Sequence, residues 1–404
     1  MGNGAFSDAV VFFRQALDWY ASLSDSERQP EAELELLKSL ETATFTISGY
    51  GDRETQQIYD RAWALCQQIG DAPEVFPELW GLWLTYHFSA ETDKAVELGE
   101  KMMDLAQKEG DEERVLQAHH ALWTTLTLVP DYERAHKHLQ KGLALYRPDM
   151  HQTHCVHYGG HDPGMCGQRA LCLTSWSTGF PDRAMAAGHR AMELSQAHHY
   201  SIITAEMALA FVHKQRGDLR ETRDHAEAIT RRASSHGFPG FVPWANILCG
   251  WVQGQEGQLE EGLAATVAAC ESLGYKESGY MSMLVELYLL AQQPDQGMEW
   301  IASLLELVKA KNEHHYEPEL YRLQGELLAQ QQASADRTVA SFQMALDLSR
   351  GQGARAFELR AATSLVRFSR QQQPSPVAEQ ALATIYASFS EGLDTRDLRQ
   401  ARHL

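Results

Sequence analysis

The feature that most constrains this chain is a small residue that recurs at spacings of 40, 49, 38, 40, 35 and 41 positions. Each copy follows an apolar, aromatic-rich stretch and a short turn that contains Gly, Pro, Asp or Glu. A period of this size is typical of helical repeats, in which each two-helix hairpin stacks on the next. We expect the small residue near the start of the second helix, where two antiparallel helices approach closely. The copies are Ala95, Ala135, Ala184, Thr222, Gly262, Gly297 and Thr338.

This periodicity predicts an all-α fold, a right-handed α-solenoid of tetratricopeptide-like helical hairpins. The mean spacing exceeds the usual repeat length of about 34 residues, which indicates longer helices and longer loops. Glycine-centred turns at 216–218 and 256–258 are expected to end helices. No segment carries a good strand pattern. We therefore expect one continuous superhelix over residues 1–404, because a solenoid has a single uninterrupted core.

Within that superhelix the ends differ from the middle. We expect an N-terminal half-repeat at 5–70, regular repeats at 75–350 with a His/Gly-rich insert loop at 147–165, and C-terminal capping helices at 354–404. The expected flanking helices cover 8–17, 31–47, 55–69, 354–370 and 377–391. The chain thus begins in mid-repeat, as a fragment or a stand-alone descendant of a longer protein would. An apolar edge near Val10, Val11, Phe12 and Phe13 would then favour self-association.

The composition limits the classes of partner that we expect and indicates the cell compartment. The 35 basic and 54 acidic side chains leave a formal net charge of 35 − 54 = −19. Such a chain has no basic field for a nucleic-acid backbone or an anionic membrane surface. No run of 18 apolar residues and no signal-peptide pattern occurs, and the six cysteines are scattered as free thiols would be. We expect a cytoplasmic protein with no nucleic-acid and no membrane partner.

Four sequence motifs lie, in this order along the chain, at 117–122, 147–184, 353–362 and 391–398. Together they resemble the C-terminal tetratricopeptide regions of bacterial signalling proteins. That family joins such a region to a predicted STAND-type ATPase, and often to a class III adenylate cyclase or a protein kinase. The resemblance covers about residues 7–404 and implies a sensor or scaffold. The chain lacks a G-x-x-x-x-G-K-[ST] phosphate-binding loop, so ATPase, cyclase or kinase activity is not expected.

The repeat frame also predicts which first-helix positions face the concave groove. Those positions combine tryptophans with a few polar groups, as binding surfaces do. This favours a signalling or scaffold-type binding module that holds a peptide, protein or small-molecule ligand. The competing interpretation is that these aromatic side chains are simply core. The predicted groove residues are Trp80, His120, Arg169, Trp176, Lys214, Trp244, Trp251 and Glu286.

The insert loop offers a different function. Imidazole, thiolate and carboxylate groups cluster there, at His151, His154, Cys155, His157, His161, Asp162 and Cys166. A zinc, iron or copper ion held by His120, His157, His161 and Asp162 would make the chain a metal-dependent enzyme or metal sensor. The sequence requires no cofactor, however. Asp162 followed by Pro163 also reads as a helix N-cap and first turn, and the cysteines read as small buried apolar residues.

Overall fold

The computed structural model describes residues 3–24, 26–48, 53–69, 75–89, 91–151, 158, 162–195, 198–273 and 276–404. All regular secondary structure in these ranges is helical, which confirms the predicted all-α fold. Within the same ranges, no helix is both long and apolar enough to cross a bilayer. The chain divides into two compact units, residues 1–125 and 126–404. A single continuous superhelix over 1–404 therefore stays a prediction, and each unit is described by itself.

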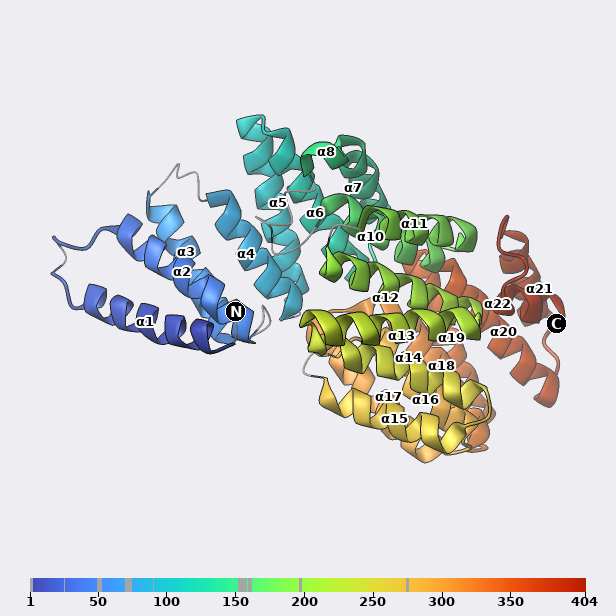
Figure 1. The fold of residues 1–404 in the computed structure, drawn as a ribbon. Helices are drawn as coiled ribbons and strands as arrows, with labels where there is room; N and C mark the ends of the chain where they lie inside the picture. The colour runs from blue at the N-terminus through green and yellow to red at the C-terminus, as the bar shows by residue number, and fades with distance from the viewer. Residues whose placement is uncertain are drawn as a thin grey trace. The chain divides into compact units, whose positions relative to one another are not determined.

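The first unit is a row of helices that pack in sequence order (Figure 1). The expected N-terminal helices are all present, and the first is longer than predicted at both ends. Of the predicted apolar edge, Val11 and Phe12 are exposed, whereas Val10 is buried. Trp19 on the same helix is 70% exposed. The helices are α1 (Asn3–Ala21), α2 (Pro30–Ser48), α3 (Arg53–Ile69), α4 (Val75–Phe88), α5 (Thr92–Glu109) and α6 (Glu112–Leu128), whose last turn enters the second unit.

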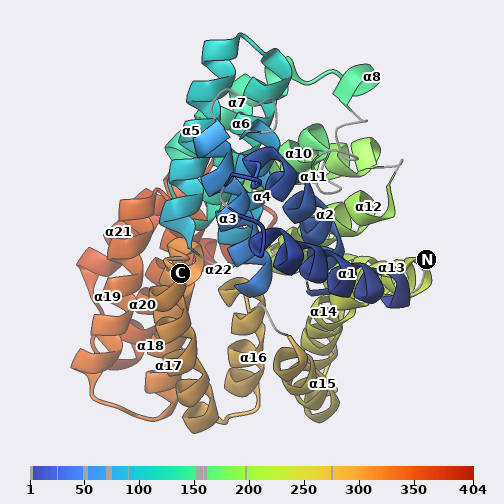
Figure 2. The same ribbon diagram turned by 90° about the vertical axis from the view of Figure 1, so that its left-hand side faces the viewer.

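The second unit is a stack of helical hairpins, α10–α11, α12–α13, α14–α15, α16–α17, α18–α19 and α20–α21 (Figures 1 and 2). Its helices are α7 (Tyr132–Leu145), α8 (Pro148–His151), α10 (Pro163–Ser177), α11 (Pro181–Leu194), α12 (His199–Arg216), α13 (Leu219–His236), α14 (Val242–Gln255) and α15 (Leu259–Ser272). They continue as α16 (Ser278–Leu290), α17 (Pro294–Lys311), α18 (Glu317–Gln330), α19 (Ala335–Gln352), α20 (Arg355–Gln372), α21 (Pro376–Ala387) and α22 (Arg396–Arg402), with short 3-10 turns η2 (Pro239–Phe241) and η3 (His314–Tyr316).

The recurring small residues sit where the sequence places them. Each is the fourth residue of a second helix, from Ala95 in α5 to Thr338 in α19, and each is buried. The predicted turn at 216–218 ends α12 at Gly217, which has φ +86°. Glycine adopts this left-handed conformation without a Cβ clash, so the chain turns there into the next helix. Local sequence therefore sets both the close helix pairs and the ends of the helices.

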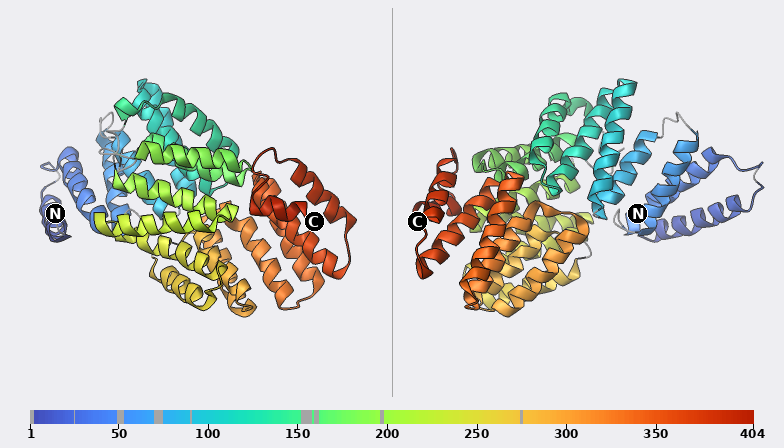
Figure 3. Two further views of the ribbon diagram at one scale, coloured as in Figure 1. Left: turned by 45° about the vertical axis from the view of Figure 1, so that its right-hand side comes forward. Right: turned by 180° about the vertical axis from the view of Figure 1, so that it is seen from behind.

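The second unit closes on itself. Each first helix contacts the next along the series α10, α12, α14, α16, α18 and α20, and α20 contacts α10 again. The C-terminal helices thus lie beside α10 to α12 (Figure 3). The segment before α22 fastens this closure: Glu391 accepts hydrogen bonds from two backbone N–H groups in the first turn of α11, at 2.9 and 3.0 Å. The backbone N–H of Gly392 donates to Asp182 at 3.1 Å. A carboxylate at a helix N-terminus is also favoured by the helix dipole.

Aromatic side chains fill part of the interior of this ring. The ring centroids of Trp176 and Phe357 lie 5.2 Å apart, and those of Phe357 and Tyr316 lie 5.0 Å apart. Phe211 meets Tyr316 edge-on at 6.1 Å. The Tyr316 hydroxyl accepts a hydrogen bond from the amide of Gln215 at 2.9 Å. This contact joins the aromatic layer to a layer of charged side chains that lies next to it.

Candidate functional site

A pocket of about 430 Å³ opens beside the charged layer, lined by α14, α16, α18, α20 and α22. Its walls carry leucines at the rim, but most of the lining is charged or amide-bearing. A volume of this size falls within the range of about 300–1,000 Å³ that small-ligand and peptide sites occupy. The charged and glutamine residues that line it are Glu286, Glu319, Arg322, Glu326, Arg360, Arg367, Arg396, Asp397, Gln255, Gln292, Gln330 and Gln400.

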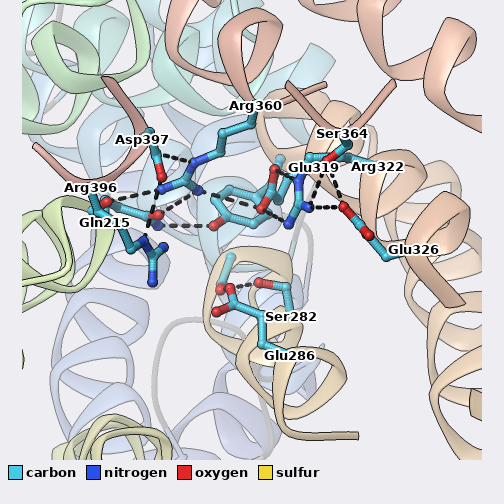
Figure 4. A network of polar contacts seen from close by, with 12 residues as sticks. Gln215, Ser282, Glu286, Glu319, Arg322, Glu326, Arg360, Ser364, Arg396 and Asp397 are labelled. Carbon is cyan, nitrogen blue, oxygen red and sulfur yellow. Dashed lines mark hydrogen bonds and ion pairs between the residues drawn. The ribbon is translucent and has the colours of Figure 1, made fainter. Parts of the chain in front are cut away.

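Seven of these residues form a continuous row of alternating charge. Figure 4 shows the row from Arg396 to Glu326. We call this row the charge line, in the order Arg396, Asp397, Arg360, Glu319, Arg322, Glu326, Arg367. The ion pairs between successive members are 3.6, 2.5, 3.4, 2.8 and 3.2 Å long, and the last pair joins Glu326 to Arg367. The line runs from α22 through α20 and α18 and returns to α20.

Arg360 is the central group of the charge line. Its Nε donates to Asp397 at 2.5 Å, its Nη1 donates to the side-chain oxygen of Gln215 at 2.8 Å, and its Nη2 donates to the Gln215 carbonyl at 3.0 Å. The guanidinium also lies 4.9 Å from the ring centroid of Trp176, a cation–π distance. One buried arginine therefore ties together α10, α12, α20 and α22. Burial alone lowers its pKa, but Asp397 and Glu319 outweigh that effect and raise the pKa.

Arg322 holds the other half of the line. Its Nε and Nη2 donate to the two carboxylate oxygens of Glu319 at 2.9 and 2.8 Å, and its Nη1 reaches Glu326 at 3.2 Å. Glu326 also accepts from the Ser364 hydroxyl at 2.6 Å. Bidentate arginine–carboxylate pairs fix both side chains in one geometry. The floor of the pocket is thus rigid before any ligand arrives.

Three predicted groove residues meet beside this line. Lys214 is fully buried, and its Nζ lies 2.5 Å from one carboxylate oxygen of Glu286, while the indole N–H of Trp251 donates to the other oxygen at 2.9 Å. The Lys214 ammonium also lies 5.2 Å from the ring centroid of Trp251. Burial raises the pKa of Glu286, but Lys214, Arg396 and Arg360 outweigh it and hold the pKa at about 2. Glu286 lines the pocket, whereas Lys214 and Trp251 support it from behind.

The remaining predicted groove residues occupy other places. Trp80 and His120 lie in the first unit, where their buried rings are tilted to each other with centroids 5.0 Å apart. In the second unit, Trp176 belongs to the aromatic layer, and Trp244 meets a tyrosine ring at 5.0 Å. Arg169 is half-buried on α10. Contact with a ligand remains a prediction for all of these residues.

The predicted metal set is only partly described. His157 and His161 lie outside the described residues, as do His154 and Cys155. Asp162 caps α10, because its carboxylate accepts from the backbone N–H of Met165 at 2.7 Å; this confirms the N-cap interpretation. Among the residues that are described, no group of three or more His, Cys, Asp or Glu side chains is placed to hold a metal ion. The metal site stays a prediction.

Sequence reasoning missed the whole charge line. The predicted groove residues ended at Glu286, so none was assigned on α18, and α20 was treated only as a capping helix. The helix α22 was not expected. A usable signal was present, since two of the blocks that carry the family resemblance contain Arg360, Arg396 and Asp397. Of these, Arg360 lies between apolar residues of its helix, where an unpaired charge would be costly.

Comparison with known proteins shows the fold. No family model matches the chain. The uncharacterized protein R02095 of Rhizobium meliloti (strain 1021) is 24% identical over 378 residues, which is 90% of this chain but 36% of that protein, so the chain spans about a third of its length. Among solved structures, a Rap protein complexed with Competence and Sporulation Factor has a TM-score of 0.52 at 9% identity, covering 87% of this chain and 99% of its own.

The hetero-tetramer of the anaphase-promoting complex proteins Cut9 and Hcn1 (APC/C Cut9-Hcn1) gives a TM-score of 0.52 at 12% identity, over 92% of this chain and 59% of that chain. At these identities the likeness concerns the fold alone. It confirms the predicted solenoid of tetratricopeptide-type hairpins. The predicted link to STAND-type ATPase and cyclase fusions remains a prediction.

Proposed function

We propose that this chain is a binding module that holds a short peptide or protein segment in the pocket of its second unit. The observation that carries this proposal is a polar pocket of about 430 Å³ that four first helices of the ring and α22 line. A core built only for stability would be better served by apolar groups, because burying ion pairs costs desolvation free energy. Charged groups fixed in a concave surface are instead suited to recognition.

The arrangement supports binding in a second way. Because the buried pairs already fix the charge line, a ligand would lose little free energy in ordering the site. The Rap structure of similar fold contains a bound Competence and Sporulation Factor, and Cut9 is seen with Hcn1. These partners belong to those proteins, but both cases show a helical-repeat solenoid engaged with another molecule. A role as the sensing or scaffolding part of a longer signalling protein fits the same proposal.

The test is to select peptides from a displayed random library on the full chain and on a pocket-blocked variant. Gln400 is an exposed lining residue on α22, so Gln400→Trp fills the pocket without disturbing the core. Gln380→Trp makes the same change at an exposed position on α21, outside the pocket. We expect peptides that bind the native chain and the Gln380→Trp variant, and that lose binding to Gln400→Trp. Equal binding to all three proteins would refute the pocket as the site.

A further inference from the structure

The charge line ends in an arginine at both of its ends. The two inner arginines are each flanked by two carboxylates: Arg360 by Asp397 and Glu319, and Arg322 by Glu319 and Glu326. In contrast, the one ion pair of Arg396 among the described residues is with Asp397, at 3.6 Å, and its side chain is 32% exposed.

At the other end, Arg367 pairs with Glu326 alone in the part of the chain that the structure describes, and its side chain is 46% exposed. Both end arginines therefore face the pocket with donors that their single carboxylate partners do not use.

The net charge of the charge line also favours an anionic ligand. It holds four arginines and three carboxylates, so its net charge is 4 − 3 = +1. Glu286 does not alter this balance, because Lys214 neutralises it. Burial raises the pKa of Asp397, but Arg360 and Arg396 outweigh it and lower that pKa, so Asp397 stays ionised at neutral pH. The pocket is thus a cationic spot in a chain whose formal net charge is −19.

Amide groups around the pocket favour a ligand that contains peptide bonds. A glutamine side chain carries a donor and an acceptor side by side, as a peptide bond does. Gln255, Gln292 and Gln400 line the wall. Gln330 donates from its Nε2 to the Leu289 carbonyl at 2.8 Å, whereas its buried Oε1 has no hydrogen-bond partner in the part of the chain that the structure describes. That acceptor would be satisfied by an N–H group from a ligand in the pocket.

We propose that the pocket selects acidic peptides, with one carboxylate on Arg396 and a second on Arg367. This inference rests on the peptide-binding function proposed above and names its ligand class. An arginine with unused donors receives a carboxylate in a bidentate pair that is stronger than a neutral hydrogen bond. Because five linked residues separate the two ends of the line, a compact anion such as phosphate engages one end only. A peptide with two acidic groups engages both, and its backbone N–H reaches Gln330.

The experiment is isothermal titration of the full chain with three probes: the N-acetyl-Glu-Ala-Glu amide, the uncharged N-acetyl-Gln-Ala-Gln amide, and inorganic phosphate. We expect the acidic tripeptide to bind at least about tenfold more tightly than either other probe, because a charge-assisted hydrogen bond is worth about that factor. Arg396→Gln and Arg367→Gln should each weaken its binding by about tenfold. Arg350→Gln makes the same charge change outside the pocket, at an arginine paired with Glu358, and should leave binding unchanged.

The other possible outcomes separate a failure of the acidic preference from a failure of the proposed function. If library peptides bind in a Gln400-dependent way but the acidic tripeptide has no advantage, the acidic preference is wrong and the peptide-binding function stands. If phosphate binds as tightly as the tripeptide, the site is a general anion site and the two-ended preference is wrong. If no peptide of any composition binds, the proposed function fails as well. Arg367 is half exposed and makes one ion pair, so its variant tests the inference even if Arg396→Gln perturbs α22.

Discussion

The packing of α14 against α15 predicts whether replacing Gly262 by alanine stabilises or destabilises the protein. These helices meet almost backbone to backbone at Gly262. A Cβ atom built at this position lies 2.4 Å from the carbonyl oxygen of Gly250 and 2.7 Å from the backbone nitrogen of Gly254. Neither atom belongs to a flexible side chain that could rotate away. Gly262→Ala must therefore push the two helices apart.

Two effects oppose each other in this variant. Alanine favours a helix over glycine by about 1 kcal/mol. Overpacking a tight interior site costs about 1–3 kcal/mol, and the upper end applies here because the colliding atoms are main chain. The net change is a loss of about 2 kcal/mol. Gly351, in α19, is the matched control, since nothing lies within 4 Å of a Cβ built there. Gly351→Ala should gain up to about 1 kcal/mol.

Thermal unfolding followed by circular dichroism measures both variants. For a unit of this size, 1 kcal/mol corresponds to about 2–4 °C in Tm. We expect Gly262→Ala to lower the midpoint of the second unit by about 4–8 °C, and Gly351→Ala to raise it slightly. A Gly262→Ala protein as stable as the Gly351→Ala protein would refute the close approach of α14 and α15.

Two further predictions concern buried charge. Lys214→Met leaves the Glu286 carboxylate buried without its cation, so it should cost about 3–5 kcal/mol in urea unfolding. A Lys214→Met, Glu286→Met double variant that is no more stable than the single variant would contradict this reasoning. In the first unit, burial and the neighbouring carboxyl of Glu78 raise the pKa of Glu41 well above its unfolded value. The folded state therefore binds more protons, and its stability should fall as pH rises above about 4.5 towards the folded pKa. Glu41→Gln should remove this fall in Tm measured against pH; an unchanged pH dependence would exclude Glu41 as its source.

The sequence predicted the hairpins well because their determinants are local. A small residue at the fourth position of each second helix is visible in the chain itself, and so is the glycine that ends α12. Closure of the second unit is different, because it depends on the rotation that accumulates over successive hairpins. The hydrogen bonds from Arg360 to Gln215 join residues 145 positions apart. No local pattern indicates such a pair.

The candidate site was predicted in part for the same reason. The repeat frame gives the direction in which a first-helix side chain points, and the structure brings together three of the residues that it selected, Lys214, Trp251 and Glu286. The frame does not predict how deeply a side chain is buried, so it could not show that Lys214 is fully buried while Glu286 lines the pocket. Depth follows from the closure of the ring. The charge line was equally hard to foresee, because Arg360 on α20 joins Glu319 on α18 to Asp397 on α22.

The most direct test of the central claim is hydrogen–deuterium exchange of the full chain, with and without a peptide selected from the library. Slower exchange over α16, α18, α20 and α22 on peptide addition is the result that a ligand in the pocket predicts. Protection confined to the outer helices α15, α17 and α19, or to residues 1–125, would contradict it and place the binding surface elsewhere.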